Sequence, residues 1–231
     1  MNNTLCSVAI DGPAGAGKST IAKAAAKRFG FIYVDTGAIY RTVGLAACRA
    51  GVAKDDVQGV TALLPGLAVR FDYGPDGAQR MHLNGEDVSG LIRTPEISLY
   101  ASAVSAIPEV RAFLLDMQRE MARTMSVVMD GRDIGTVVLP DAGLKIFLTA
   151  SAEERAKRRL AELREKGDPS TYEEVLADMR LRDHNDETRA AAPLKAAEDA
   201  VLVDTSSLTL EQSIDRVCAL VEERFFPEGT K

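Results

Sequence analysis

The sequence predicts an α/β fold with a five-stranded parallel sheet, and two observations support this class. Short apolar runs rich in β-branched residues recur along the chain, and helical patterns separate them, as in a parallel sheet covered by helices. The chain has 231 residues and is 46% hydrophobic, so it can bury one sizeable core. We expect one domain over residues 1–231, with core strands at residues 5–10, 31–34, 126–129, 144–148 and 201–203.

Helix starts are well marked along the chain. A Ser or Thr followed three residues later by Glu or Gln can form a capping box, and proline is favoured at the first helical position. We expect helices to begin at Thr94-Pro95, Ser151 with Glu154, Thr171 with Glu174, and Thr209 with Gln212.

One segment departs from this alternation and predicts a small antiparallel β insertion at residues 64–93. Apolar alternation at residues 67–73 and 80–83 flanks a Gly-Pro-Asp-Gly turn. Asn84-Gly85 follows, and this dipeptide between apolar alternations is a strong hairpin signal. We expect the insertion to form a subdomain on the substrate side.

A second departure is the charged stretch at residues 153–166, which ends at Gly167-Asp168-Pro169. Its charge density suits a solvated helix. We expect residues 153–168 to form a short, mobile helical lid.

Composition excludes several classes of protein. The formal charge of −6 argues against a general nucleic-acid binder. The sequence has no run that approaches a transmembrane helix and no signal peptide, so we expect a cytoplasmic protein without a membrane partner. Cys6, Cys48 and Cys218 are odd in number and widely spaced, which suits reduced thiols. Two histidines leave little scope for a histidine-based metal site.

The most informative motif is a glycine-rich loop between the first strand and the first helix. It fits the pattern G-x-x-x-x-G-K-[ST] in full, with Gly12, Pro13, Ala14, Gly15, Ala16, Gly17, Lys18 and Ser19, followed by Thr20. Such a loop directs backbone N–H groups at phosphate oxygens, and the helix N-terminus adds partial positive charge. Lys18 can reach the terminal phosphates and Ser19 can ligate magnesium. The motif predicts nucleoside triphosphate binding.

The rest of the sequence narrows the kind of nucleotide-binding protein. The motif N-K-x-D, which reads guanine in GTPases, is absent, because none of the asparagines precedes a lysine. A signature of the ABC type is absent as well. These two absences argue against a GTPase and against an ABC-type protein.

Four segments together resemble the bacterial cytidylate kinases. They are residues 11–20, residues 35–41 (Asp-Thr-Gly-Ala-Ile-Tyr-Arg), residues 130–135 (Asp-Gly-Arg-Asp-Ile-Gly), and Arg182-Asp183 with Asp186 and Arg189. Their order and spacing hold along essentially the whole chain, and the β insertion is also a feature of that family. Thr36 departs mildly, since many members have serine there. The resemblance implies transfer of the ATP γ-phosphoryl group to CMP or dCMP in pyrimidine metabolism, with Mg²⁺.

Two anionic substrates demand local positive charge in this acidic chain. Arg41, Arg111, Arg132 and Arg189 fit that demand. We expect Arg41 to lie in the first turns of a helix capped by Thr36, although an ordinary surface arginine is the alternative on position alone. Lys18 and Arg132, with Arg182 and Arg189, are the expected catalytic residues. The attacking phosphate oxygen of CMP is already ionised, so a general base is not needed.

Further residues are expected to bind the metal ion and to recognise the cytosine ring. Asp130 follows a strand at its carboxyl end, where ligands sit in open α/β sheets, and is the first choice to orient magnesium beside Ser19; Asp35 is the second. The resemblance implies that Ser102, Arg111 and Asp133 read cytosine. A carboxylate that accepts from the N4 amino group, with an arginine donating to N3 or O2, matches that edge.

Two further arginine sets have helical spacing. Arg182, Asp186 and Arg189 are expected to share a helical face, and the resemblance puts Arg189 on phosphate, Asp186 on the sugar and Arg182 near the transferring group. Arg155 and Arg159, with Arg158 between them, resemble lid arginines that close over ATP. A salt-bridged solvent face is the alternative for each set.

Two other functions stay open at this point. One is a kinase for another small acceptor, such as a different nucleoside monophosphate or shikimate. The other is a regulatory or binding protein that has no acceptor and hydrolyses ATP slowly. We expect a monomer acting on small molecules.

Overall fold

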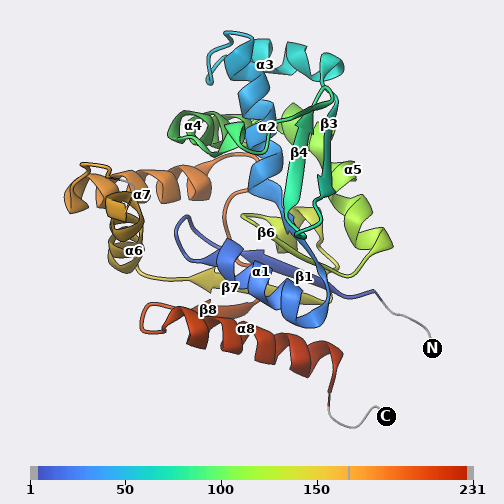
Figure 1. Ribbon diagram of the computed structural model, residues 1–231, viewed down its shortest axis with the longest axis vertical. Coiled ribbons are helices and arrows are strands. Elements are labelled where there is room, and N and C mark those ends of the chain that lie inside the picture. The colour runs from blue at the N-terminus through green and yellow to red at the C-terminus, as the bar shows by residue number, and fades with distance from the viewer. Residues whose placement is uncertain (1–4, 166, 228–231) are drawn as a thin grey trace. The chain divides into compact units, whose positions relative to one another are not determined.

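The computed structural model describes residues 5–165 and 167–227 (Figure 1). The chain divides into two compact units. The first unit comprises the chain up to Tyr33 and from Ala122 onward, and the second runs from Val34 to Met121. The glycine loop motif lies in the first unit and the β insertion in the second.

A five-stranded sheet of order β2-β6-β1-β7-β8 is the framework of the fold. The pairs β1–β6, β1–β7 and β7–β8 are parallel. The strands are β1 (Ser7–Asp11), β2 (Ile32–Asp35), β6 (Val127–Gly131), β7 (Leu144–Thr149) and β8 (Val201–Asp204). Each overlaps the strand expected from the sequence, and the predicted fold class is confirmed.

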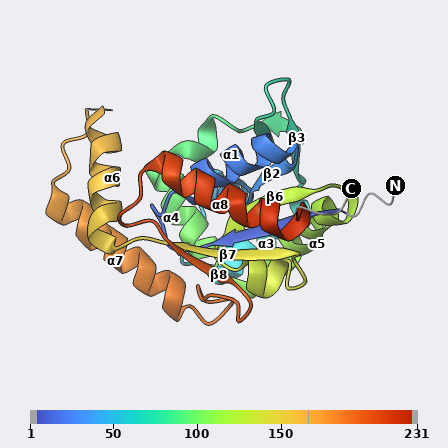
Figure 2. The same cartoon turned by 90° about the horizontal axis from the view of Figure 1, so that it is seen from below.

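Helices α1 (Lys18–Phe29) and α8 (Leu210–Phe225) pack on one face of this sheet (Figure 2). Val8, Ala9 and Ile10 of β1 are all fully buried, as expected for a central parallel strand covered on both faces. Val8 and Ile10 join Ile21 of α1 and Val217 of α8 in one apolar cluster. This packing holds the carboxyl end of β1, and with it the start of the glycine loop.

Helices α6 (Ala152–Glu165) and α7 (Tyr172–Thr188) lie side by side in the first unit (Figure 1). They share a small apolar cluster that is separate from the sheet's cluster and consists of Ala156, Leu160, Val175 and Met179. The predicted lid, residues 153–168, covers most of α6 and the following turn, and its residue 166 lies outside the described residues.

The second unit carries a three-stranded antiparallel sheet of order β3-β4-β5. Gly77 in the first turn has a φ of 75°, and Asn84 and Gly85 in the second have φ of 51° and 90°. These left-handed conformations are the ones that tight hairpin turns require. The unit's elements are α2 (Thr36–Arg49), α3 (Val57–Leu63), η1 (Leu64–Gly66), β3 (Val69–Tyr73), β4 (Gln79–Leu83), β5 (Glu86–Asp87), η2 (Leu91–Arg93), α4 (Pro95–Val104) and most of α5 (Pro108–Thr124).

The expected helix starts are confirmed. Thr94 caps α4 with Pro95 at the first position, and Thr171 and Thr209 form capping boxes with Glu174 and Gln212. Within the described residues, no single helix is long and apolar enough to cross a membrane; α4 and α5 meet that criterion only when taken together across a 98° bend.

Candidate active site

The glycine loop (residues 12–17) connects β1 to α1 and depends on glycine backbone. Gly12, Gly15 and Gly17 have φ of 149°, 74° and 86°, which side-chain-bearing residues rarely adopt. A Cβ on Gly12 would collide with the carbonyl oxygen of Leu148 in β7. No side chain caps α1, and no acidic residue occupies its first turn. The first N–H groups of α1 are therefore left for an anionic ligand.

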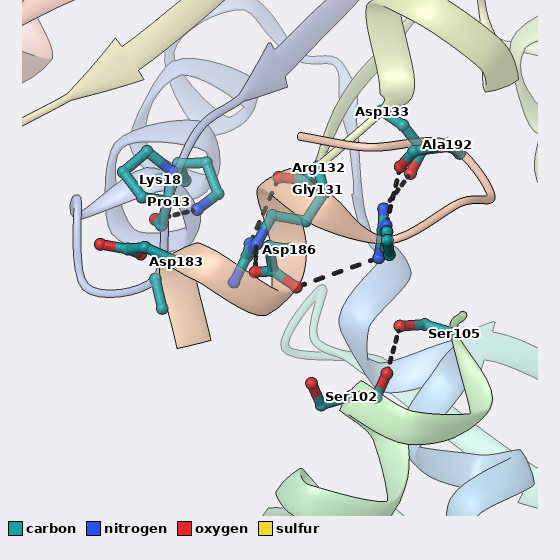
Figure 3. A network of polar contacts seen from close by, with 12 residues as sticks. Pro13, Lys18, Ser102, Ser105, Gly131, Arg132, Asp133, Asp183, Asp186 and Ala192 are labelled. Carbon is teal, nitrogen blue, oxygen red and sulfur yellow. Dashed lines mark hydrogen bonds and ion pairs between the residues drawn. The ribbon is translucent and has the colours of Figure 1, made fainter. Parts of the chain in front are cut away.

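Lys18 turns its ammonium back onto the loop. Its Nζ donates to the carbonyl oxygen of Pro13 at 2.7 Å (Figure 3), and its side chain is buried. Burial, followed by the nearby positive charge of Arg132, lowers the pKa of Lys18 well below its ordinary value. Asp130, Asp11 and Asp186 raise this pKa, but by less than burial and Arg132 lower it, so a phosphate in the loop would add counter-charge to this buried ammonium.

Asp130, near the end of β6, accepts a hydrogen bond on each carboxylate oxygen. The hydroxyl of Ser19 donates to Oδ2 and that of Tyr33 donates to Oδ1, both at 2.8 Å. A serine hydroxyl beside a carboxylate is an oxygen donor set that suits Mg²⁺. No cluster of three or more His, Cys, Asp or Glu side chains that could hold a metal occurs among residues 5–165 and 167–227. The pair therefore fits an ion that takes its other ligands from phosphates and water.

Asp35, the second candidate for the metal, has different partners. Its Oδ1 accepts from the backbone N–H of Ala38, so Asp35 is the N-cap of α2. Its Oδ2 lies 3.0 Å from an Nη of Arg93, and Arg41 lies 3.9 Å from Oδ1. The expectation that Thr36 caps this helix is wrong, because Thr36 is already its first residue. An aspartate side chain reaches the third N–H as a capping threonine would.

Two arginine–aspartate pairs join the residues that follow β6 to the end of α7 in the first unit. The Nε of Arg132 lies 2.7 Å from Oδ2 of Asp186 in α7 (Figure 3), and Arg189 lies 3.5 Å from Asp133 and 4.0 Å from the other oxygen of Asp186. Asp133 and Asp186 are both buried. Buried carboxylates that pair with guanidinium groups hold these forks in fixed orientations.

The three residues expected on one face of α7 do not share one environment. Helix α7 ends at Thr188, and Arg189 is its C-cap residue in an extended conformation. Asp186 is buried, whereas Arg182 is exposed. The structure therefore joins Asp186 and Arg189 with Arg132 and Asp133, and these contacts do not include Arg182.

The arginines of α6 also separate. Arg155 is buried and donates to the carbonyl oxygens of Ala14 and Ala150, both at 2.9 Å, and its two Nη atoms lie 3.1 and 2.6 Å from the carboxylate of Asp183. Arg158 instead donates to Thr205, and Arg159 pairs with Glu162. Within α6 the three arginines therefore have different partners, and among these contacts it is Arg155 that reaches the glycine loop.

In the second unit, Arg111 is held at the end of a short chain of contacts. Its Nη1 donates to the carbonyl oxygen of Ser105 at 3.1 Å, and its guanidinium lies 5.6 Å from the ring centre of Tyr40. The hydroxyl of Ser105 donates to the carbonyl oxygen of Ser102 at 2.9 Å (Figure 3). Ser102, a residue predicted from the sequence, is thus linked to Arg111 through Ser105. Sequence reasoning did not predict a role for Ser105.

In the same unit, the missing side chain of Gly37 leaves room for the guanidinium of Arg41. A Cβ on Gly37 would come within 3.2 Å of an Nη atom of Arg41. A side chain at this position would require that guanidinium to shift by a few tenths of an ångström. Thr36 beside it is buried, and Arg41 itself is a quarter exposed.

Sequence reasoning missed Asp11, the last residue of β1. Its two carboxylate oxygens accept from the backbone N–H groups of Ile134 and Gly135, each at 2.7 Å. These donors open a π-helical segment, η3 (Ile134–Val138), directly after Asp133. Burial raises the pKa of Asp11 to about 6 in spite of both backbone hydrogen bonds. An acidic residue at the end of a buried strand, one position before the glycine loop, was the available signal.

The fold and the site define a class. A parallel sheet with a glycine loop, a Ser–Asp pair beside it and arginines after the neighbouring strand is the arrangement of a P-loop kinase.

Comparison with known proteins identifies the family. The sequence profile described as "Cytidylate kinase" matches residues 8–223. A cytidylate kinase of Geobacter sp. (strain M21) is 53% identical over 218 residues, which cover 94% of this chain and 93% of that one. One of Caldicellulosiruptor saccharolyticus is 50% identical over 213 residues, or 92% and 94% of the two chains. This chain belongs to the cytidylate kinase family.

Likeness to solved structures is weaker. A shikimate kinase from Bacteroides thetaiotaomicron aligns over 94% of this chain and 98% of its own, with 16% identity and a TM-score of 0.48. A likeness at this level does not support any conclusion about fold or function beyond the observed strand order.

Proposed function

We propose that this protein transfers the γ-phosphoryl group of ATP to CMP or dCMP, and that it thereby serves pyrimidine nucleotide metabolism. The observation that carries the proposal is the pair of arginine forks, Arg132 and Arg189, set by buried aspartates in the unit that holds the glycine loop. A protein that bound ATP alone would need no second set of oriented cations. Family membership identifies the acceptor as a cytidine monophosphate.

The chemistry requires two anions in line and little covalent help. An ionised phosphate oxygen of CMP attacks the γ-phosphorus, the bond from that phosphorus to the β–γ bridging oxygen breaks, and ADP leaves. Lys18 neutralises charge on the transferred group, and the N–H groups of the glycine loop hold the other ATP phosphates. Arg132 and Arg189 hold the acceptor phosphate, with Arg182 near the transferring group.

Ser19 and Asp130 would hold magnesium, and the ion would neutralise charge that develops on the phosphates. Three contacts support Asp130 over Asp35 for this role: the hydroxyl of Ser19 already bonds Asp130, whereas Asp35 caps α2 and pairs with Arg93. Asp130 therefore orients the ion, and Asp35 shapes the start of α2.

The acceptor residues are assigned within each unit separately. In the second unit we assign Thr36 and Arg41 to the acceptor phosphate, and Ser102 and Arg111 to the cytosine ring. In the first unit we assign Asp133 to the N4 amino group and, from its pairing with Arg132, Asp186 to the sugar hydroxyls. Residues 64–93 belong to the substrate side.

The ATP side rests on the first unit alone. Residues 153–168 serve as a lid over ATP, which is supported by the separate apolar cluster that α6 and α7 share. Arg159 is the lid arginine best able to turn toward a nucleotide, since its ion pair is with the exposed Glu162 one turn away on the same helix. Arg155 acts on ATP through the carbonyl oxygen of Ala14 in the glycine loop. We further propose that the protein is cytoplasmic and a monomer, and light scattering tests its oligomeric state.

A panel of acceptors tests the function. Purified protein is incubated with MgATP and, separately, CMP, dCMP, UMP, AMP, GMP, shikimate or no acceptor, and ADP formation is followed. We expect CMP and dCMP to give turnover far above the reaction without acceptor. Turnover with shikimate or a purine monophosphate instead would assign another acceptor. Slow ATP hydrolysis that no acceptor changes would indicate a regulatory protein and overturn the proposal.

A further inference from the structure

Tyr33 is buried in the first unit, and its hydroxyl reaches one of the site's acidic groups. The hydroxyl donates to Oδ1 of Asp130 at 2.8 Å, while Ser19 donates to Oδ2 of the same carboxylate at 2.8 Å. The two donors come from different elements, Tyr33 from β2 and Ser19 from α1. A carboxylate that is held on both oxygens cannot rotate about its Cβ–Cγ bond without breaking one of the two hydrogen bonds.

The position of this hydroxyl is set by the fold. β2 and β6 are neighbours in the sheet, so Tyr33 and Asp130 lie on adjacent strands. The ring of Tyr33 belongs to the apolar cluster beneath α1, and the Nζ of Lys23 in α1 lies 5.4 Å from its centre. Helix α1 therefore contacts both partners of this hydrogen bond: Ser19 bonds the carboxylate of Asp130, and Lys23 lies over the ring of Tyr33.

The two hydrogen bonds differ in whether the donor can move when a ligand binds. Ser19 is exposed and belongs to the nucleotide motif, so its hydroxyl is free to turn toward a cation that arrives with the phosphates. Tyr33 is 9% exposed and fixed by strand and ring packing, so its hydroxyl stays. After Ser19 turns away, the hydrogen bond from Tyr33 to Oδ1 still holds this carboxylate.

We propose that Tyr33 is a positioning residue for the phosphoryl-transfer site, whose hydroxyl keeps the carboxylate of Asp130 oriented toward Ser19 while Ser19 engages a divalent cation. The inference rests on the proposed function only in that it needs a nucleotide and a divalent cation at the glycine loop. Residues that orient metal-binding groups from the outside commonly change metal affinity or activity by 10- to 100-fold when removed. Because Asp130 itself would act on the ion through water, we expect an effect near the lower end.

The first test measures binding and needs no acceptor. The dissociation constant of a non-hydrolysable ATP analogue is measured by calorimetry, in EDTA and again in Mg²⁺, for wild type and Tyr33→Phe. The variant should bind the analogue normally in EDTA and lose about five- to tenfold of the affinity gained from Mg²⁺. An equal metal effect in the two proteins would overturn the proposal, as would an equal loss with and without metal, which a structural role produces.

A matched control is available in the second unit. The hydroxyl of Tyr100 also makes a hydrogen bond, to the carbonyl oxygen of Val52 at 3.1 Å, and Tyr100 has no assigned part in the site. Tyr100→Phe removes the same atom and should leave the metal effect unchanged. Melting curves of both variants without ligand check that each is folded.

A double-mutant cycle separates orientation from general weakening. In an Asp130→Asn background the carboxylate is gone, so Tyr33→Phe should cause no further loss of the metal effect. Additive losses would mean that Tyr33 acts through another route, and the assignment would fall. Neither experiment depends on which acceptor is used, so a failed acceptor panel and a failed role for Tyr33 remain distinguishable.

Discussion

The Nζ atom of Lys18 lies 2.7 Å from the carbonyl oxygen of Pro13, five residues earlier in the glycine loop motif. The ammonium is buried there, and burial lowers its pKa well below the ordinary value. A single neutral carbonyl is a poor substitute for phosphate oxygens as a partner of a buried cation. This contact therefore holds the side chain inside the loop, in reach of the ligand it is expected to bind.

Replacing Lys18 or Ser19 by alanine should reduce turnover to less than a tenth of wild type. Both side chains belong to the glycine loop motif and are assigned to the phosphates and the metal, so their loss should remove ligand contacts without opening the apolar core. Steady-state rates with saturating MgATP and CMP measure the effect, and circular dichroism checks the fold. Lys27→Ala, at the exposed end of α1, is the matched control. More than a tenth of wild-type turnover in a folded variant would count against these site assignments.

Arg41→Ala should weaken the use of CMP more than tenfold and leave ATP affinity without CMP unchanged. A charge-assisted contact with phosphate contributes about 1.5–3 kcal/mol, which corresponds to that range. KM for CMP and calorimetry with an ATP analogue measure the two affinities. Arg49→Ala removes another arginine of α2, whose partner is the exposed Glu86, and should change neither. Loss of ATP binding with intact CMP binding would move Arg41 to the other substrate.

Arg132→Ala should differ from Arg41→Ala by lowering stability as well as CMP use. The side chain pairs with Asp186 at 2.7 Å, and that carboxylate is buried. An aspartate left without this partner should cost about 3 kcal/mol of folding free energy. Urea denaturation without ligand measures the loss. If Arg132→Ala unfolds at the same urea concentration as wild type, the pair does not hold Asp186 as we describe.

Asp133→Ala should erode the preference for CMP over UMP. Cytosine offers an amino donor at C4, whereas uracil offers a carbonyl oxygen that a fixed carboxylate repels, so we expect wild type to prefer CMP by about a hundredfold or more. Ratios of kcat/KM measure the preference, with Asp141→Ala at an exposed position as control. Asp133 also pairs with Arg189 at 3.5 Å. An unchanged ratio would leave Asp133 as a partner of Arg189 alone.

Arg111→Ala separates the two roles within base recognition. An arginine can donate to the O2 atom that cytosine and uracil share, so its loss should impair both pyrimidines about equally. The same kcat/KM measurements distinguish this pattern from that of Asp133→Ala.

Asp11 predicts a pH-dependent difference in stability between wild type and Asp11→Asn. Burial raises the pKa of Asp11 to about 6 in the folded protein, above its ordinary value of 3.8. The folded state therefore binds the proton more tightly than the unfolded state, so the stabilisation is present below pH 3.8 and is lost as pH rises through 6. Wild type should gain about 2 kcal/mol relative to the variant between pH 7 and pH 4. Urea denaturation without nucleotide across this range measures it.

The charged groups near Asp11 set the control for this experiment. Asp133 raises its pKa and Lys18 lowers it, in both cases less than burial raises it. Asp116→Asn, at an exposed position of α5, leaves these groups in place and should show no such trend. A stability difference between wild type and Asp11→Asn that stays constant from pH 7 to pH 4 would show that Asp11 titrates as an ordinary aspartate.

The sequence by itself determined the elements and the nucleotide loop of this protein. Strand, glycine loop and helix are adjacent in the chain, so the motif at residues 12–19 and the capping boxes at Thr171 and Thr209 depend only on local geometry. The hairpin turn at Asn84-Gly85 is local for the same reason. The family followed from four such local segments in order.

Only the tertiary structure decided which charged groups meet. Arg132 and Asp186 are 54 positions apart, and Asp130 lies 97 positions from Tyr33 and 111 from Ser19. Contacts of this kind depend on the strand order of the sheet, which no residue spacing along the chain reveals. The helical spacing of Arg155 and Arg159 suggested one cluster, but packing against the glycine loop buried Arg155 and left Arg159 beside Glu162. Local periodicity determines which face of a helix a side chain occupies, whereas residues that are distant in sequence and packed nearby determine its contacts.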